Sequence, residues 1–149
     1  MKYTIAIGSD HAGFDVKERI IDALNSGILE DFNGGISDMG PESSDRVDYP
    51  DYAHKVAKAV SEGTCNLGIL ICGSGNGVCI TANKHEGIRA GLAWDIELAS
   101  LAREHNNANI ICIPARFVSE EKALEIVKAF LGSAFEGGRH QDRVSKIEG

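Results

Sequence analysis

The run Leu67-Gly-Ile-Leu-Ile-Cys72 leads directly into the glycine-rich segment Gly73-Ser-Gly-Asn-Gly77. A continuous apolar run of this length is typical of a strand that is buried on both faces. Closely spaced glycines after such a run are typical of a tight turn from a strand into a helix. We therefore expect Leu67–Cys72 to be a central strand of a parallel sheet.

Short apolar runs and helical stripes alternate outward from this strand in both directions. Apolar residues at helical spacing predict helices over Phe14–Asn25, Asp51–Glu62, Asp95–Glu104 and Ser119–Leu131, with a short last helix after Gly137-Gly138. Further strands are expected over Tyr3–Gly8, Ile88–Ala93, Asn109–Ile113 and in a weaker apolar segment, Ile28–Phe32, ending near Asp38. Helices between strands imply right-handed crossovers and an α/β sandwich around a mostly parallel sheet of about five strands.

The first helix has a clear apolar stripe. Val16, Ile20, Ile21 and Leu24 fall on one face, whereas Lys17, Glu18 and Asp22 fall off it. The stretch Gly40–Pro50 has turn and polar residues without a period, so we expect a surface loop there.

Composition favours one folded domain over residues 1–149. The chain is 43% apolar and 25% charged, and its net charge is −7. An acidic chain lacks the basic face that general nucleic-acid binding or attachment to an anionic membrane requires. Its N-terminal apolar run is too short for a signal sequence, and no run approaches the roughly 18 apolar residues of a membrane span. We therefore expect a cytoplasmic protein that binds neither nucleic acid nor membrane.

Reactive side chains follow the predicted strands. Ligands of open parallel sheets bind outside the carboxyl ends of the strands, so this edge is where the chemistry is expected. The residues delivered there are Asp10, His11, Asp38, Cys72 with its glycine-rich segment, Trp94, Asp95 and Arg116.

Cys72 and the glycines beside it are the most informative of these residues. Backbone N–H groups of such a turn are free to point at an anion, although the spacing matches neither the dinucleotide nor the P-loop motif. Cys72 is a candidate base or nucleophile. The alternatives are a tight turn without a ligand and a cysteine that is a small buried hydrophobe, which is the expectation for Cys65, Cys79 and Cys112.

Histidines and arginines complete the set of candidates. His54 and His85 are expected on the surface. His11 and His105 lie beside other polar residues at the ends of predicted elements, so they are candidates for a functional role. No tight His/Asp/Glu spacing is present, so no catalytic metal is expected. Arg139 and Arg143 would share one face of a short helix and could grip a phosphate dianion, or the helix could simply be solvated.

Seven motifs in order resemble the ribose 5-phosphate isomerase type B family over nearly the whole chain. They are Gly8-Ser-Asp-His-Ala-Gly-Phe14, Asp48-Tyr-Pro-Asp-Tyr-Ala53, Ile71-Cys-Gly-Ser-Gly-Asn-Gly77, Ala82-Asn-Lys84, Gly87-Ile-Arg-Ala90, His105-Asn106 and Gly137-Gly-Arg-His-Gln-Asp-Arg143. The resemblance implies a Rossmann-like fold and a homodimer or dimer of dimers. It also implies interconversion of ribose 5-phosphate and ribulose 5-phosphate without metal or organic cofactor.

The resemblance also implies a role for each matching residue. Cys72 is similar to the base that takes the C2 proton, Ser74 supports it, and His105 with Asp10 nearby opens the furanose ring. The remaining substrate contacts are implied for Tyr49 and Asn106 at the sugar, for the backbone of Gly73, Gly75, Asn76 and Gly77 at the enediolate oxygen, and for His11, Arg116, Arg139 and Arg143 at the phosphate. The last two arginines would reach in from the neighbouring subunit, which places the active sites at the subunit interface.

Two alternatives remain open on the sequence. Isomerases of allose 6-phosphate and galactose 6-phosphate are similar to this family, and a non-catalytic module could bind a phosphosugar with the same loop and arginines. Some family members use a glutamate directly after the glycine loop as the base. Here that position is Val78 and Cys72 is present, so the chain resembles the cysteine type.

Overall fold

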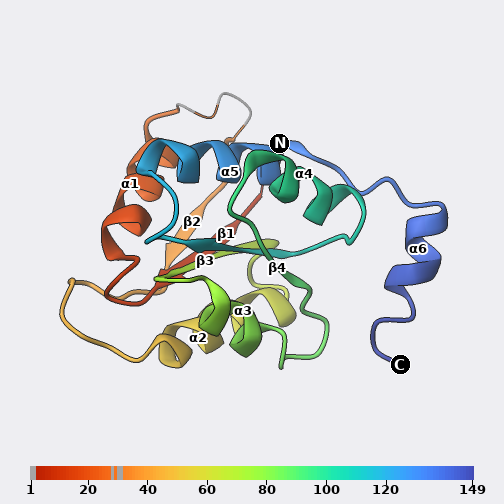
Figure 1. The fold of residues 1–149 in the computed structure, drawn as a ribbon, viewed down its shortest axis with the longest axis horizontal. Coiled ribbons are helices and arrows are strands. Elements are labelled where there is room, and N and C mark those ends of the chain that lie inside the picture. The colour runs from red at the N-terminus through yellow and green to blue at the C-terminus, as the bar shows by residue number, and fades with distance from the viewer. Residues whose placement is uncertain (1–2, 28, 30–31) are drawn as a thin grey trace.

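A computed structural model describes residues 3–27, 29 and 32–149, and it contains one five-stranded parallel sheet (Figure 1). The strands are β1 (Ile5–Ser9), β2 (Ile36–Asp38), β3 (Leu67–Cys72), β4 (Ala90–Leu92) and β5 (Ile110–Pro114), in the spatial order β2-β1-β3-β5-β4. All four neighbouring pairs are parallel. The predicted α/β architecture with a central β3 is confirmed.

Helices cover both faces of the sheet (Figure 1). Helices α1 (Phe14–Asn25), α4 (Ile96–Glu104) and α5 (Glu120–Gly132) pack on one face, and α2 (Tyr49–Ser61) and α3 (Asn76–Ala82) pack on the other. The short helix α6 (Arg139–Val144) lies at the margin of the molecule. None of the helices in the described residues is long and apolar enough to cross a membrane.

Strand β3 serves both halves of the core. Ile69 and Ile71 point into the cluster under α1, α4 and α5, whereas Leu70 and Cys72 belong to the cluster under α2 and α3. All six residues of the strand are buried. The apolar run is continuous because helices cover both faces of the strand.

The second strand lies away from its predicted segment, and the bounds of most other elements differ from the predictions by one or two residues. The second strand is Ile36–Asp38, whereas the sequence predicted it from Ile28–Phe32. Leu29 and Phe32 of that segment are not in a strand, and residues 28, 30 and 31 lie outside the described residues. Helix α2 begins at Tyr49, with Pro50 in its first turn, so the loop predicted over Gly40–Pro50 ends earlier. Proline fits this position because the first turn of a helix needs no donor from it.

Lys17 is buried, although it falls off the predicted apolar stripe of α1. Its side chain is 0% exposed, and its Nζ donates to both carboxylate oxygens of Asp38 at 3.0 Å and to Glu18 Oε1 at 2.8 Å. The ammonium group also lies 5.1 Å from the centre of the Phe14 ring. Lys17 therefore ties α1 to the end of β2 through charge-assisted hydrogen bonds.

Removing the charge of Asp38 is expected to destabilise the fold. In Asp38→Asn the buried Lys17 ammonium keeps only Glu18 as a charged partner, so the free energy of unfolding should fall by about 1–3 kcal/mol. Asp22→Asn on the same helix is the control, because the exposed Asp22 side chain has no ion pair among the described residues, and it should change stability by less than about 0.5 kcal/mol. Urea unfolding of the two variants tests this, and equal stability would contradict the role of Lys17.

Candidate active site

Cys72 ends β3 beside the exit of β5. The Ala115 N–H donates to the Cys72 carbonyl at 2.9 Å, and the Arg116 N–H donates to the Gly73 carbonyl at 3.0 Å. These bonds bring the Arg116 guanidinium against the turn over residues 73–77, where a Cβ added at Gly73 would lie 3.0 Å from Arg116 Nη1. The two strand ends thus place a cation beside the turn that follows the thiol.

The turn over Gly73–Gly77, here called the glycine loop, exposes backbone donors. Gly75 has a φ of +75°, a conformation that side chains disfavour, and a Cβ there would lie 2.5 Å from Leu92 Cδ1. In the described part of the chain, the N–H groups of Gly73, Ser74 and Gly75 donate to no acceptor, while the Asn76 N–H donates to Ser74 Oγ at 3.3 Å. Unpaired amides of this kind can stabilise a negatively charged oxygen.

Asp10, His11 and Tyr49 surround the same edge of the sheet. Asp10 is 8% exposed, and its Oδ1 accepts the Gly13 N–H at 3.0 Å. His11 Nδ1 lies 3.3 Å from the Val47 nitrogen and 3.2 Å from its carbonyl oxygen, so the loop before α2 holds the ring. The Tyr49 ring lies against Gly77, where a Cβ would be 2.5 Å from Cε1. We call Asp10, His11, Tyr49, Cys72, the glycine loop and Arg116 the carboxyl-edge group.

Cys72 itself is deeply placed. It is 4% exposed and packs in the apolar cluster under α2 and α3. Burial raises the pKa of Cys112 in the same cluster well above its usual range, and the neighbouring Cys79 and Cys72 raise that pKa further. Burial alone would suit a structural cysteine. Cys72 differs from the buried Cys65 and Cys112 because it directly precedes the glycine loop.

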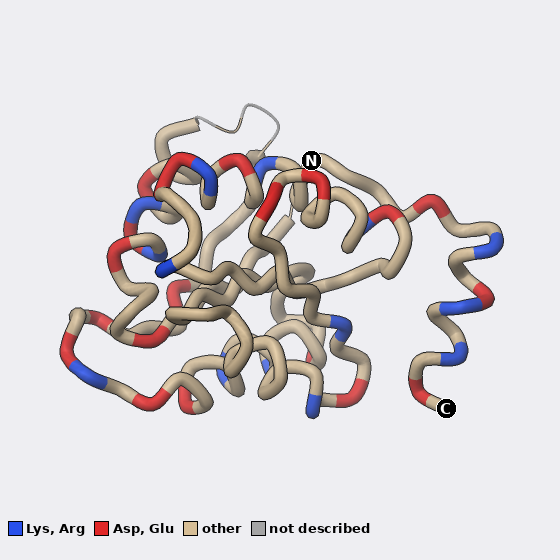
Figure 2. Tube along the Cα trace, in the orientation of Figure 1, with Lys and Arg blue, Asp and Glu red and all other residues tan. Residues whose placement is uncertain are grey.

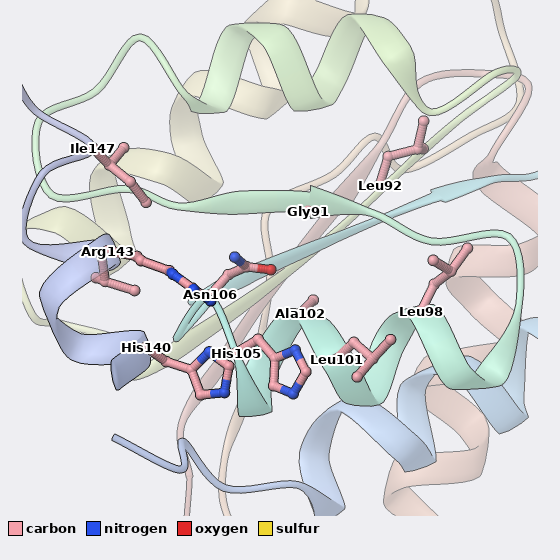
Figure 3. Close-up of a pocket in the computed structure, with 11 residues that line it drawn as sticks. Gly91, Leu92, Leu98, Leu101, Ala102, His105, Asn106, His140, Arg143 and Ile147 are labelled. Carbon is pink, nitrogen blue, oxygen red and sulfur yellow. The ribbon is translucent and has the colours of Figure 1, made fainter. Parts of the chain in front are cut away.

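His105 and Asn106 lie at the opposite edge of the sheet. His105 caps the C-terminus of α4, and Asn106 follows it on the way into β5. Both border a cavity of about 520 Å³ that is also lined by His140 and Arg143 of α6 (Figure 3). Helix α6 and the residues just after it carry three basic residues, Arg139, Arg143 and Lys146, interspersed with the acidic Asp142 and Glu148 (Figure 2). We call His105, Asn106, Arg139 and Arg143 the amino-edge group.

The His105 ring stacks on the ring of His140. Their centres are 4.1 Å apart and their planes differ by 12°. Glu136 Oε1 lies 3.7 Å from His105 Nε2 and 3.5 Å from His140 Nε2. Burial lowers the pKa of His140, and the charges of His105, Arg139 and Arg143 lower that pKa further against the opposing effect of Glu136. Sequence reasoning gave Glu136 and His140 no role, although their spacing of four residues was a visible signal.

The two groups do not meet within one chain. Cys72 pairs with Pro114 at the end of β5, whereas His105 precedes the start of β5 at Ile110. The five residues of β5 separate these edges by roughly 13 Å at about 3.3 Å per residue. The expectation that Asp10 lies near His105 is therefore not met inside a single copy, because Asp10 follows β1 at the carboxyl edge.

The other strand-end candidates have structural partners. Asp38 binds Lys17 and accepts the Gly40 N–H at 2.9 Å, and Asp95 caps α4 by accepting the Ile96 N–H at 2.8 Å. Trp94 is 54% exposed. Cys65 and Cys112 are buried as expected, whereas Cys79 is only partly buried and donates to the Ala90 carbonyl at 3.3 Å.

Comparison with known proteins gives a consistent result. The family model described as Ribose/Galactose Isomerase matches residues 5–147. The chain is 45% identical to probable ribose-5-phosphate isomerase B of Mycoplasma pneumoniae, covering 99% of this chain and 94% of that protein. It is 46% identical to ribose-5-phosphate isomerase B of Escherichia coli, covering 96% of this chain and 93% of that protein.

A solved structure also matches closely. The crystal structure of ribose-5-phosphate isomerase B from Mycoplasma genitalium with bound ribulose-5-phosphate has a TM-score of 0.89 and 43% identity, covering 97% of this chain and 93% of that chain. The match therefore extends over both groups of candidate residues. The chain belongs to the ribose/galactose isomerase family.

Proposed function

We propose that this protein is an aldose–ketose isomerase that interconverts ribose 5-phosphate and ribulose 5-phosphate without a metal or organic cofactor. The family membership and the relatives named for this reaction support the activity. The observation that carries the proposed chemistry is the placement of Cys72 directly before a loop with unpaired N–H groups. A base next to oxyanion donors is what proton removal beside a carbonyl requires.

The reaction needs two proton-transfer stages. His105 would move a proton during opening of the furanose ring, leaving an aldehyde at C1. Cys72, as thiolate, would then take the proton from C2, and the electron pair would move to give an enediolate. The N–H groups of the glycine loop would hold its negative oxygen. Transfer of the hydroxyl proton from O2 to O1 and return of the proton from Cys72 to C1 would then give the ketose, with the carbonyl at C2 and a hydroxyl at C1.

The remaining residues of both groups would position the sugar phosphate. Ser74 would support Cys72, Tyr49 and Asn106 would contact the sugar, and His11, Arg116, Arg139 and Arg143 would bind the phosphate through charge-assisted hydrogen bonds. Asp10, held by its hydrogen bond from Gly13, would lie beside a His105 that comes from another copy.

A homodimer would complete each active site. The carboxyl-edge group of one copy would face the amino-edge group of its partner, and a two-fold axis would build two such sites from the same pair of surfaces. This extends the sequence prediction, in which only Arg139 and Arg143 cross the interface. It is supported by the opposite positions of Cys72 and His105 on the sheet. A tetramer would contain two of these dimers. The cytoplasmic location of the protein stays a prediction from its sequence.

Substrate preference is tested by kinetics on three sugar phosphates. We expect kcat/KM to be at least about tenfold higher for ribose 5-phosphate than for allose 6-phosphate or galactose 6-phosphate, because a site shaped for five carbons must shift to admit a sixth. A higher value for a six-carbon substrate would contradict the proposed preference. Absence of C2 proton exchange with all three would favour the phosphosugar-binding module.

A further inference from the structure

His105, Glu136 and His140 form a cluster that the isomerase chemistry does not use as a unit. Their nearest ligand atoms all lie within 4.8 Å of one another. Glu136 Oε1 is 3.5 Å from His140 Nε2 and 3.7 Å from His105 Nε2. In tetrahedral zinc sites, metal–ligand bonds of about 2.0–2.2 Å place neighbouring ligand atoms roughly 3.3 Å apart. The two ligand pairs that include Glu136 are therefore already close to coordinating distance.

We propose that this cluster is a binding site for a divalent transition metal, such as Zn²⁺ or Co²⁺, and that the bound metal inhibits the enzyme. Two imidazoles and one carboxylate suit these borderline metals, whereas Mg²⁺ and Ca²⁺ prefer oxygen ligands. Three protein ligands leave a fourth position open for water. The adjoining cavity of about 520 Å³, which His105 and His140 line, can supply that water (Figure 3).

Side-chain mobility makes the necessary adjustment possible. The two rings are nearly parallel, and at least one must tilt before both nitrogens can point at one metal ion. The side chains of His105 and Glu136 are 39% and 52% exposed, whereas that of His140 is 8% exposed. His105 and Glu136 can therefore move toward a metal that His140 anchors. The 39% exposure of His105 is that of the single chain. In the proposed dimer this side chain faces the substrate site, so a metal ion would enter by the route that the substrate takes.

Positive charge near the cluster weakens the binding of a metal cation, and the negative charge of Glu136 offsets part of this effect. The charges of Arg139 and Arg143 lower the pKa of His140, and Glu136 opposes them by raising that pKa. Metal binding must also compete with protons for both histidines. Glu136 therefore supplies the charge on which affinity depends most, and its neutralisation is the sharpest test.

Inhibition follows from the role of His105 and so rests on the proposed function. A metal on the imidazole nitrogen removes the electron pair that His105 needs for proton transfer during ring opening. The metal site itself does not depend on that role. Direct binding and activity are therefore separate measurements.

The experiment is titration of the full-length protein with Co²⁺, followed by visible absorption and calorimetry. We expect one Co²⁺ per chain with the absorption of nitrogen and oxygen ligation, and affinity reduced at least about tenfold in Glu136→Gln and in His140→Asn. His85→Asn is the matched control. Its ring pairs with His54 at 2.7 Å, the other histidine pair in the described residues, and no third ligand completes that pair.

Three results would overturn the site: unchanged affinity in Glu136→Gln, loss of binding in His85→Asn, or an intense sulfur-to-cobalt charge-transfer band that shows thiolate ligation. Zn²⁺ should inhibit ribose 5-phosphate isomerisation by the parent at concentrations that leave the residual activity of Glu136→Gln unaffected. Metal binding at the cluster without loss of activity would contradict both the proposed inhibition and the proposed role of His105 in ring opening. Circular dichroism checks that each variant is folded.

Discussion

Cys72→Ala is expected to lower kcat for ribose 5-phosphate by about 10²–10⁴-fold, the usual contribution of a positioned general base. Exchange of the C2 proton with solvent should fall by the same factor, because alanine has no group that can take the proton. The change removes one small buried atom, so its effect on the free energy of unfolding should be about 1 kcal/mol. Activity and stability thus separate a catalytic cysteine from a merely packed one.

Cys65→Ala is the matched control for this variant. Cys65 is 4% exposed, the same fraction as Cys72, and it packs in the same apolar cluster. It precedes β3, whereas Cys72 ends the strand, so its loss should alter stability without altering kcat. C2 exchange in Cys72→Ala at the parental rate would remove Cys72 from the mechanism.

The parts of the fold with strong periodicity were predictable from the sequence. The apolar run of β3 and the stripe of α1 were recognised because each matches one period over its whole length. Strand β2 was misplaced because it has only three residues, none of them fully buried. Lys17 was misread because its burial depends on Asp38, a partner twenty-one residues away that no local period shows.

The candidate residues were predicted more fully than their arrangement. Strand ends identified Asp10, Cys72 and Arg116, because the carboxyl ends of parallel strands share one edge. The same rule implies that a helix returning between parallel strands ends at the other edge, which is where His105 lies. The family resemblance implies that Asp10 lies near His105. One chain holds these two residues at opposite edges of the sheet, so their proximity stays a prediction for two copies. The contacts of His105 with Glu136 and His140 needed the chain after α5 to return to the end of α4, which no motif specified.

A heterodimer of two inactive variants is expected to regain activity. In Cys72→Ala each site lacks the base, and in His105→Asn each site lacks the ring-opening group. A dimer with one copy of each variant would have one site with both defects and one intact site, because each site draws the two residues from different copies. Its activity should be about half that of the parent dimer.

Co-expression of the two variants with different affinity tags, followed by sequential purification on both tags, gives this heterodimer free of either homodimer. Isomerisation of ribose 5-phosphate by the purified species is then compared with that of the parent and of each variant alone. The shared site predicts recovery to about half of the parental rate. Activity no higher than that of the single variants would mean that Cys72 and His105 do not act together across two copies.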